Sequence, residues 1–195
     1  MKDVNCSLKE NQNHKKCIPK PLINYFGGKQ RVADKIIQQF PEHKTFVEPF
    51  VGGGSVYWKN NIPDQFIIND LNKDVYHLYS HAKNSPGSVM KCDIQNMSRD
   101  QFYKVKSKKK KNACEIIKLH KHGFSGLPTS YASKKGKKIG NPMTENNLRK
   151  LKKTVILNKD YKDIIKKYDK GKDTVFYLDP PYVVQAGKSY VTDNG

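Results

Sequence analysis

The sequence predicts an α/β fold on the basis of three observations. Four short β-prone segments alternate with segments that carry apolar residues at helical spacing, a glycine-rich turn follows the first of these strands, and aspartates end two others. Strands that are separated by helical crossovers pair in parallel, and both faces of such a sheet are covered. Because parallel strands end at a common edge, we expect the glycines and the aspartates to lie close together there.

The predicted strands are short apolar segments that are rich in β-branched and aromatic residues. They occupy residues 45–48, 65–69, 154–157 and 174–178. Helices are predicted from apolar spacing and from the capping residues Ser55, Ser98 and Thr144. The helical segments are residues 32–40, 55–58, 71–82, a short helix that starts at residue 98, and residues 113–119, 144–151 and 161–168.

A long insertion separates the second and third strands and divides the chain into four parts. Residues 1–20 are polar, aperiodic and basic, so we expect a flexible leader. Residues 21–90 carry the first two strands, residues 91–153 form the insertion, and residues 154–195 carry the last two strands. The insertion is predicted to be a basic, mostly helical lobe attached to the sheet.

The chain is strongly basic, and its charge is concentrated in one region. Its 37 lysines and arginines outnumber its 18 aspartates and glutamates, which gives a formal net charge of +19. Residues 104–153 hold 15 lysines and Arg149 against Glu115 and Glu145, a net charge of +14. This density favours a polyanionic partner, and the aromatic and glycine residues between the lysines favour nucleic acid. A solvated, soluble surface is the alternative interpretation of the lysine runs.

The composition also excludes several classes of protein. No apolar segment approaches the roughly 20 residues of a membrane span, and the N-terminus lacks the apolar stretch of a secretory signal. We therefore expect a cytoplasmic protein without a membrane partner. The cysteines are too far apart for a paired-ligand zinc pattern, and the cytoplasm is reducing. We expect neither a metal site nor a disulfide at Cys6, Cys17, Cys92 and Cys114.

Two features at predicted strand ends favour a nucleotide-like cofactor. Gly52, Gly53 and Gly54 follow the first strand and lack side chains, so their backbone can approach a ligand closely. Asp70 ends the second strand, 18 residues beyond Gly52, where its carboxylate can accept hydrogen bonds from ribose hydroxyls. The alternatives are an ordinary turn for the glycines and a helix cap for Asp70.

The tetrapeptide Asp179-Pro180-Pro181-Tyr182 follows the clearest strand and is the most specific motif. Its two prolines fix φ and remove two N–H donors, so carboxylate and carbonyl oxygens face the crevice without competing donors. Asp179 and the Pro180 carbonyl can draw protons from an exocyclic amino group such as that of adenine, which makes its nitrogen more nucleophilic. Tyr182 can stack on the base. The alternative is a proline turn with a packed tyrosine.

Four ordered motifs together resemble the Dam-type adenine-N6 DNA methyltransferases. They are Asn24-Tyr25-Phe26-Gly27-Gly28-Lys29, the glycine loop at 46–56, Ile68-Asn69-Asp70-Leu71-Asn72 and the tetrapeptide at 179–182. The resemblance implies a Rossmann-like parallel sheet of the S-adenosylmethionine-dependent methyltransferase type, with S-adenosylmethionine as methyl donor. It also implies site-specific transfer to N6 of a flipped adenine in double-stranded DNA, an activity found in restriction-modification systems.

The resemblance implies roles for individual residues of these motifs. The implied cofactor-binding residues are Tyr25, Lys29, Phe50, Gly52, Gly54, Asp70 and Asp179, and the implied catalytic residues are Asp179, Pro180 and Tyr182. No metal is implied. Tyr25 stands where the family frequently has tryptophan, and an aromatic face is retained. Asp160 is placed either to meet the cofactor adenine or to cap the following helix.

The insertion resembles the target-recognition region of the same family. The segment 122–126, followed by residues 134–141, matches the region that precedes the catalytic strand and contacts DNA. Ser125 stands where the family often has asparagine. Arginine makes the forked contacts that distinguish guanine, and lysine far outnumbers arginine in this chain. The sequence therefore does not determine which DNA sequence is recognised.

Members of this family usually continue past the tetrapeptide with further strands and helices. We therefore expect a C-terminally truncated methyltransferase, one that a partner polypeptide completes, or an inactive remnant that binds DNA without turnover. Transfer to RNA or to a protein amide is a further alternative, although protein amide enzymes tend to carry asparagine at the position of Asp179.

Overall fold

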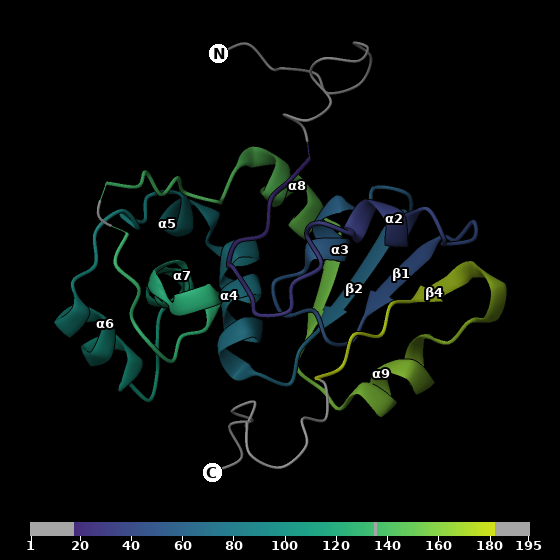
Figure 1. Cartoon of the computed structure of the whole chain (residues 1–195). Helices are drawn as coiled ribbons and strands as arrows, with labels where there is room; N and C mark the ends of the chain where they lie inside the picture. Colours follow the sequence, from purple (N-terminus) through teal and green to yellow (C-terminus); the bar gives the residue numbers. More distant parts are fainter. Residues whose placement is uncertain (1–17, 135, 182–195) are drawn as a thin grey trace, which may run out of the picture.

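The computed structural model describes residues 18–134 and 136–181, which form a four-stranded parallel sheet with helices on both sides (Figure 1). The strands are β1 (Thr45–Glu48), β2 (Gln65–Asn69), β3 (Thr154–Leu157) and β4 (Thr174–Phe176). Their order in the sheet is β3-β2-β1-β4. The predicted α/β class is confirmed, and a strand lies in each of the four predicted segments.

Helices connect the strands and fill the long segment between β2 and β3. They are α2 (Ala33–Ile37), α3 (Ser55–Lys59), α4 (Lys73–Asn84), α5 (Pro86–Met90), α6 (Arg99–Lys106), α7 (Ala113–His122), η1 (Phe124–Gly126), α8 (Glu145–Lys152), α9 (Tyr161–Tyr168) and η2 (Gly171–Asp173). In the part of the chain that the structure describes, none of these helices is long and apolar enough to cross a membrane.

The helix caps mostly follow the predicted pattern. Ser98 caps α6 and Thr144 caps α8, each within a capping box, as the sequence predicts. The prediction that Ser55 caps α3 is wrong, because Ser55 is the first helical residue and Gly54 occupies the cap position. Gly54 has a φ of 66°, a left-handed conformation that glycine adopts most readily.

β1 lies between strands that come from different parts of the chain. Val47 of β1 pairs with Ile67 of β2 on one side and with Phe176 of β4 on the other. The chain runs outward from β1 through β2 to β3, and it then returns to place β4 on the opposite side of β1. The strand order therefore reverses between β1 and β4, and ligands of open α/β sheets bind at such a reversal.

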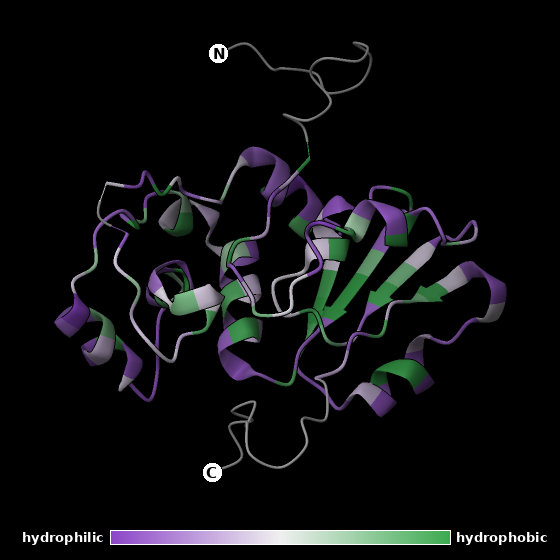
Figure 2. Cartoon of the chain, viewed as in Figure 1, coloured by the Kyte–Doolittle hydropathy of each residue, from purple (hydrophilic) through white to green (hydrophobic). Residues whose placement is uncertain are grey.

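The central strands are buried on both faces, as expected for a parallel sheet. Phe46 and Ile68 face the main core, which also contains the buried aromatic residues of α3 and the apolar side of α4. Val47 and Ile67 face the opposite side, where Ile164 of α9 covers them. Figure 2 shows the resulting concentration of hydrophobic residues in the sheet.

The segment predicted as an insertion contains a smaller buried cluster of its own. α7 packs against both α4 and α6. Met97, Phe102 and Leu119 form the buried centre of this cluster, and Val105 and Tyr131 pack around it. The later part of this predicted insertion packs with the main core instead, because α8 packs against α4 and β3.

Cys92 and Cys114 form a disulfide, with their Cα atoms 5.7 Å apart. The expectation of free thiols is therefore wrong for this pair. The cause is tertiary packing: α5 and α7 both pack on α4, which brings together two cysteines that are 22 residues apart in the sequence. Cys6 and Cys17 lie outside the described residues.

Two elements are shorter than the sequence predicts. α2 ends at Ile37, before the predicted end at Phe40. β4 ends at Phe176, although Tyr177 still donates its backbone N–H to the Val47 carbonyl at 2.9 Å. Phe40 and Tyr177 both pack against the main core, so the apolar pattern continues past the point where regular backbone bonding stops.

Lys150 of α8 is buried, with only 7% of the residue exposed. Its ammonium donates to the backbone carbonyls of Trp58 and Asn60 at the C-terminus of α3, and it lies 4.2 Å from the centroid of the Phe66 ring. Carbonyl groups at a helix end attract a cation, so Lys150 attaches α8 to α3. Burial nevertheless lowers the pKa of Lys150 to about 7, and the Glu48 carboxylate opposes this shift.

Lys150→Met should therefore change how stability depends on pH. From about pH 7 to 10.5, the ordinary pKa of a lysine, the unfolded chain binds a proton at Lys150 that the native chain does not. The free energy of unfolding should rise with pH in this window, by up to about 1.4 kcal/mol per pH unit from this group. Urea unfolding at several pH values should show that Lys150→Met lacks the rise, whereas Lys152→Met, on the exposed side of α8, keeps it. Equal slopes for the wild type and Lys150→Met would contradict this account.

Candidate active site

Three of the predicted motifs lie at the carboxyl-terminal edge of the sheet. β1 leads into the glycine turn 52–54, β2 leads into Asp70, and β4 leads through Tyr177 to Asp179. β1 pairs in parallel with both of the other strands, so all three segments leave the sheet in the same direction. This arrangement brings the motifs together where the strand order reverses.

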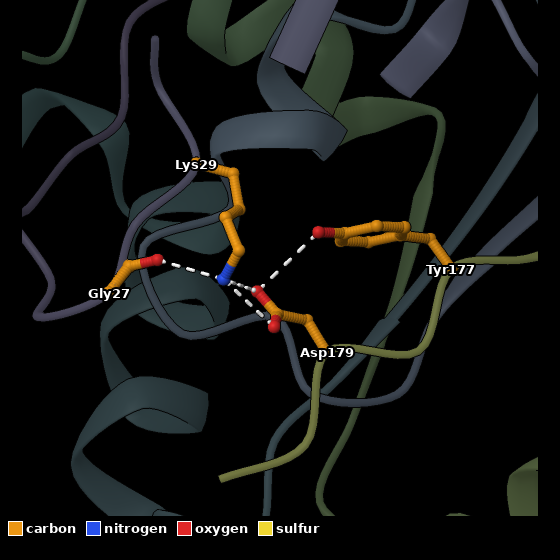
Figure 3. Close-up of polar contacts among 4 residues, drawn as sticks. All are labelled: Gly27, Lys29, Tyr177 and Asp179. Carbon is orange, nitrogen blue, oxygen red and sulfur yellow. Dashed lines mark hydrogen bonds and ion pairs between the residues drawn. The ribbon is translucent and has the colours of Figure 1, made fainter. Parts of the chain in front are cut away.

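Asp179 is held by an ion pair with Lys29 (Figure 3). The Nζ atom of Lys29 lies 2.7 Å from Oδ2 and 2.9 Å from Oδ1 of Asp179, and it also donates to the Gly27 carbonyl at 3.0 Å. The Tyr177 hydroxyl donates to Oδ2 of Asp179 at 3.5 Å. Both charged side chains are 24% exposed, so the pair remains accessible from solvent. These contacts fix the direction of the carboxylate at the end of β4.

Negative charge at this edge affects the neighbouring groups. Burial raises the pKa of Glu48, at the end of β1, well above its usual range; the Tyr57 backbone N–H opposes this shift and the charge of Asp179 adds to it. Burial and the charge of Asp179 also raise the pKa of the Tyr177 hydroxyl. At neutral pH, Tyr177 is therefore an uncharged donor, and the Lys29 ammonium balances the charge of Asp179.

The turn after β1 requires glycine for two separate reasons. Gly52 and Gly54 have φ values of 46° and 66°, in the left-handed region. A Cβ atom at Gly52 would also lie 2.9 Å from ring atoms of Tyr25, and one at Gly53 would lie 2.9 Å from the Tyr25 Cβ atom. Tyr25 therefore packs directly on the bare backbone of the turn, a closer approach than an ordinary turn demands.

Asp70 accepts hydrogen bonds from two backbone segments. Its Oδ2 atom accepts the N–H of Gly52 at 2.8 Å, and its Oδ1 atom accepts the N–H of Asn72 at 2.9 Å. The cap of α4 is Asn72, whose side chain accepts from Asp74 and Val75, so the helix-cap interpretation of Asp70 is wrong. Burial raises the pKa of Asp70, and the two backbone hydrogen bonds oppose the shift.

Phe50, Asp160 and Pro180 are the remaining predicted residues that lie in the described part of the chain. Phe50 packs against Tyr161 at the start of α9, with ring centroids 5.3 Å apart. Pro180 is exposed at the end of the β4 segment. Asp160 accepts a backbone N–H of α9 at 2.8 Å, which confirms the helix-cap alternative for this residue. Tyr182 lies outside the described residues.

Three contributors to the site were missed at the level of sequence. The Tyr177 hydroxyl and the Gly27 carbonyl bond the ion pair, and Glu48 accepts the Tyr57 N–H at 2.9 Å in a buried position. Glu48 could have been identified from the sequence, because it is an ionisable residue at the end of an apolar strand. Tyr177 and Gly27 each bond a residue only two positions away, Asp179 and Lys29 respectively. Their place in the site depends on the ion pair that joins these two distant segments, which no local pattern predicts.

The predicted target-recognition segment forms a turn after α7. Gly123 and Tyr131 form an antiparallel bridge, and η1 lies between them. Ser125 in η1 has a φ of 52°, in the left-handed region. Few residues with a side chain adopt this conformation readily, and asparagine and aspartate do so more easily than most.

The lysine run at 108–111 is partly neutralised within the chain. Lys108 pairs with Glu115, and Lys111 pairs with Asp74 at 3.1 Å. Lys109 and the other lysines near the end of α6 are exposed. Carboxylates therefore hold two lysines of the run in place, and the remaining charge faces solvent.

Comparison with known proteins finds relatives over most of the chain. Residues 25–195 match the family described as D12 class N6 adenine-specific DNA methyltransferase. A DNA adenine methylase of Haemophilus influenzae is 30% identical over 199 residues, which cover 90% of this chain and 66% of that protein. The type II methyltransferase M.MjaIII of Methanocaldococcus jannaschii is 29% identical, over 84% of this chain and 69% of the relative. The chain thus spans about two thirds of the length of these relatives.

Gly52→Ala should destabilise the fold more than a glycine-to-alanine substitution whose only cost is the left-handed backbone conformation. A left-handed alanine costs roughly 1–2 kcal/mol, and at Gly52 its methyl group would also overlap the Tyr25 ring. Gly171→Ala is the matched control, because Gly171 has a φ of 69° and nothing within 4 Å of the added Cβ. Urea unfolding should show a loss at least about 1 kcal/mol larger for Gly52→Ala. Equal losses would mean that Tyr25 does not rest on the turn.

Proposed function

Because this chain belongs to the D12 class N6 adenine-specific DNA methyltransferase family, we propose that it transfers a methyl group from S-adenosylmethionine to N6 of adenine in double-stranded DNA. The observation that carries this proposal is the position of Asp179. It follows β4, pairs with Lys29, and lies at the edge of the sheet where the strand order reverses. A carboxylate held there can receive a substrate amino group beside a cofactor bound along β1 and β2.

The substrate nitrogen needs hydrogen-bond acceptors. The exocyclic amino group of adenine has two N–H donors, and its lone pair is delocalised into the ring. When the Asp179 carboxylate and the Pro180 carbonyl accept hydrogen bonds from these two N–H groups, the lone pair becomes available for direct displacement at the methyl carbon. Pro180 and Pro181 offer no N–H that would compete. As the nitrogen becomes positively charged, Asp179 stabilises the charge and can accept the proton that is lost.

Lys29 and Tyr177 prepare Asp179 for this role. Their hydrogen bonds orient the carboxylate before a substrate arrives, so little reorganisation is required during the reaction. Preorganised acceptors act most strongly on charge that develops in the transition state. We therefore assign Lys29 and Tyr177 to the positioning of Asp179.

The residues at the ends of β1 and β2 fit S-adenosylmethionine. The glycine turn 52–54 has no side chains of its own, and the Tyr25 ring packs directly on it. Each oxygen of Asp70 accepts one backbone N–H and retains a lone pair for a ribose hydroxyl. Tyr25 and Phe50 supply aromatic faces next to these groups. When bound, S-adenosylmethionine supplies an electrophilic methyl group on a sulfonium.

We assign DNA binding to the insertion. Residues 91–153 contain most of the excess positive charge, and exposed lysines neutralise phosphates of any sequence. A base inside a duplex is inaccessible to a carboxylate at a sheet edge, so the adenine must flip out of the stack. Tyr182, which lies outside the described residues, is proposed to stack on the flipped base.

Asp179→Ala should abolish methylation and leave DNA binding intact. The substitution removes the acceptor, with an expected loss of at least about 10³-fold in initial rate, but it removes no lysine of the insertion. Rates are measured with radiolabelled methyl donor and unmethylated plasmid DNA, and binding is followed by fluorescence anisotropy at increasing salt. Asp173→Ala is the matched control, because Asp173 pairs with Lys44 at 3.0 Å near the other end of β4. This control should retain activity.

Loss of DNA binding together with methylation in Asp179→Ala would contradict the assignment. Salt-sensitive DNA binding by the wild type without methyl transfer to DNA, RNA or protein would instead favour a non-catalytic DNA-binding module. Methylation that appears only when a second polypeptide is added would mean that a partner completes the active enzyme.

A further inference from the structure

His120 of α7 is a buried histidine that connects the insertion to the cofactor motif. It is 6% exposed, and its Nδ1 atom lies 3.0 Å from the Asn24 carbonyl oxygen and 2.9 Å from the Gly126 carbonyl oxygen. Its ring stacks on Tyr25, with centroids 5.6 Å apart and an angle of 21° between the planes. Asn24 and Tyr25 belong to the cofactor motif, whereas Gly126 belongs to the turn after α7. One side chain therefore contacts both segments.

The chemistry of these contacts determines where His120 carries its proton. Carbonyl oxygens only accept hydrogen bonds, so the Nδ1 atom must be protonated and must share its hydrogen between the two carbonyls. Burial lowers the pKa of His120, and the two carbonyls oppose the shift. At neutral pH the ring is therefore uncharged, and it can stack on Tyr25 without the cost of burying a charge.

The two segments that His120 connects also touch each other directly. A Cβ atom at Gly126 would lie 2.9 Å from the backbone carbonyl carbon of Asn24, so these segments are in close contact. The next residue, Tyr25, rests its ring on Gly52. A Cβ atom at Gly52 would lie 2.9 Å from ring atoms of Tyr25. These close contacts give a route by which a shift of the turn would displace Tyr25 relative to Gly52.

The outer side of the turn is available to a ligand. Phe124 is 64% exposed, and Ser125 beside it has a left-handed backbone. Lys121, in the last turn of α7, donates to the Asn24 side-chain oxygen at 3.1 Å. An exposed aromatic ring within a basic region is suited to contact nucleic acid. A DNA contact at Phe124 would therefore act on the same turn that His120 connects to the cofactor motif.

On the basis of the proposed function, we propose that His120 is a positioning residue that couples DNA binding at the turn 123–127 to methyl-donor binding beside Tyr25. DNA that holds this turn in the described arrangement also holds the Asn24 carbonyl and the Tyr25 ring over the glycine turn. Coupling between two binding sites is reciprocal, so the methyl donor should tighten DNA binding by the same factor. Such couplings typically change affinity by about 5- to 150-fold.

The test measures binding and does not require turnover. S-adenosylhomocysteine, which has no methyl group to donate, is titrated into the full chain with and without a saturating pool of unmethylated DNA duplexes of mixed sequence. The ratio of the two dissociation constants is the coupling factor. We expect DNA to tighten binding about tenfold in the wild type. A wild-type factor of one would overturn the proposal.

Two substitutions at His120 separate its hydrogen bonds from its ring. His120→Phe keeps an aromatic ring against Tyr25 but leaves the carbonyls of Asn24 and Gly126 without their donor, so the coupling factor should fall to about one. His120→Asn places an amide N–H near the position of Nδ1 and should recover about threefold coupling. An unchanged factor in His120→Phe, or no recovery in His120→Asn, would overturn the proposal.

His43→Phe is the matched control for general loosening of the fold. His43 is also buried, at 8% exposure, and its Nδ1 atom donates to the Pro41 carbonyl at 2.7 Å, outside the candidate site. This variant loses a similar hydrogen bond and should keep the wild-type coupling factor. A loss of coupling equal to that in His120→Phe would overturn the proposal. Urea unfolding of every variant verifies that the compared proteins are folded.

The experiment also separates this inference from the proposed function. A wild-type chain that methylates adenine but has a coupling factor of one overturns the inference and leaves the proposed function intact. A chain whose S-adenosylhomocysteine binding depends on DNA and on His120, but which transfers no methyl group, supports the inference and contradicts the proposed function.

Discussion

The parallel pairing of β1 with both β2 and β4 is the constraint on which the candidate site depends. β2 follows β1 closely in the chain, whereas β4 comes after the whole insertion. Because the three strands are parallel, their carboxyl ends meet, and the glycine turn, Asp70 and Asp179 leave the sheet together. A slip of one residue in β4 would turn Phe176 away from the face that α9 covers and would carry Asp179 away from Lys29.

The ion pair between Lys29 and Asp179 contributes more to geometry than to stability. Both side chains are about one quarter exposed, so water screens their attraction, and pairs of this kind contribute roughly 0–1 kcal/mol. Apolar burial on both faces of β1 and β2 contributes far more to the free energy of folding. The pair can therefore adjust to a ligand without loss of the fold, which suits a residue that must exchange contacts during a reaction.

Interactions within a few residues were predictable, whereas contacts between distant segments were not. The capping boxes at Ser98 and Thr144 follow from residue types three positions apart, and the strand segments follow from short apolar runs. The disulfide between Cys92 and Cys114 depends on the packing of α5 and α7 on α4, which spacing along the chain does not encode. The same holds for the site, where Asp70 was identified from its place after a strand, whereas the ion pair that joins Lys29 to Asp179 was not.

The sequence by itself determined which chemical groups are available. Residue type alone provides a glycine turn that can adopt left-handed φ values, a carboxylate followed by two prolines without N–H donors, and a surplus of lysines. Only the tertiary structure decided which groups meet, as in the ion pair between Lys29 and Asp179, which are 150 residues apart, and in the bridge that His120 makes between Asn24 and Gly126. The physical reason is that such contacts depend on the strand order and on the packing of the whole chain, whereas local sequence patterns determine only local backbone conformation and burial.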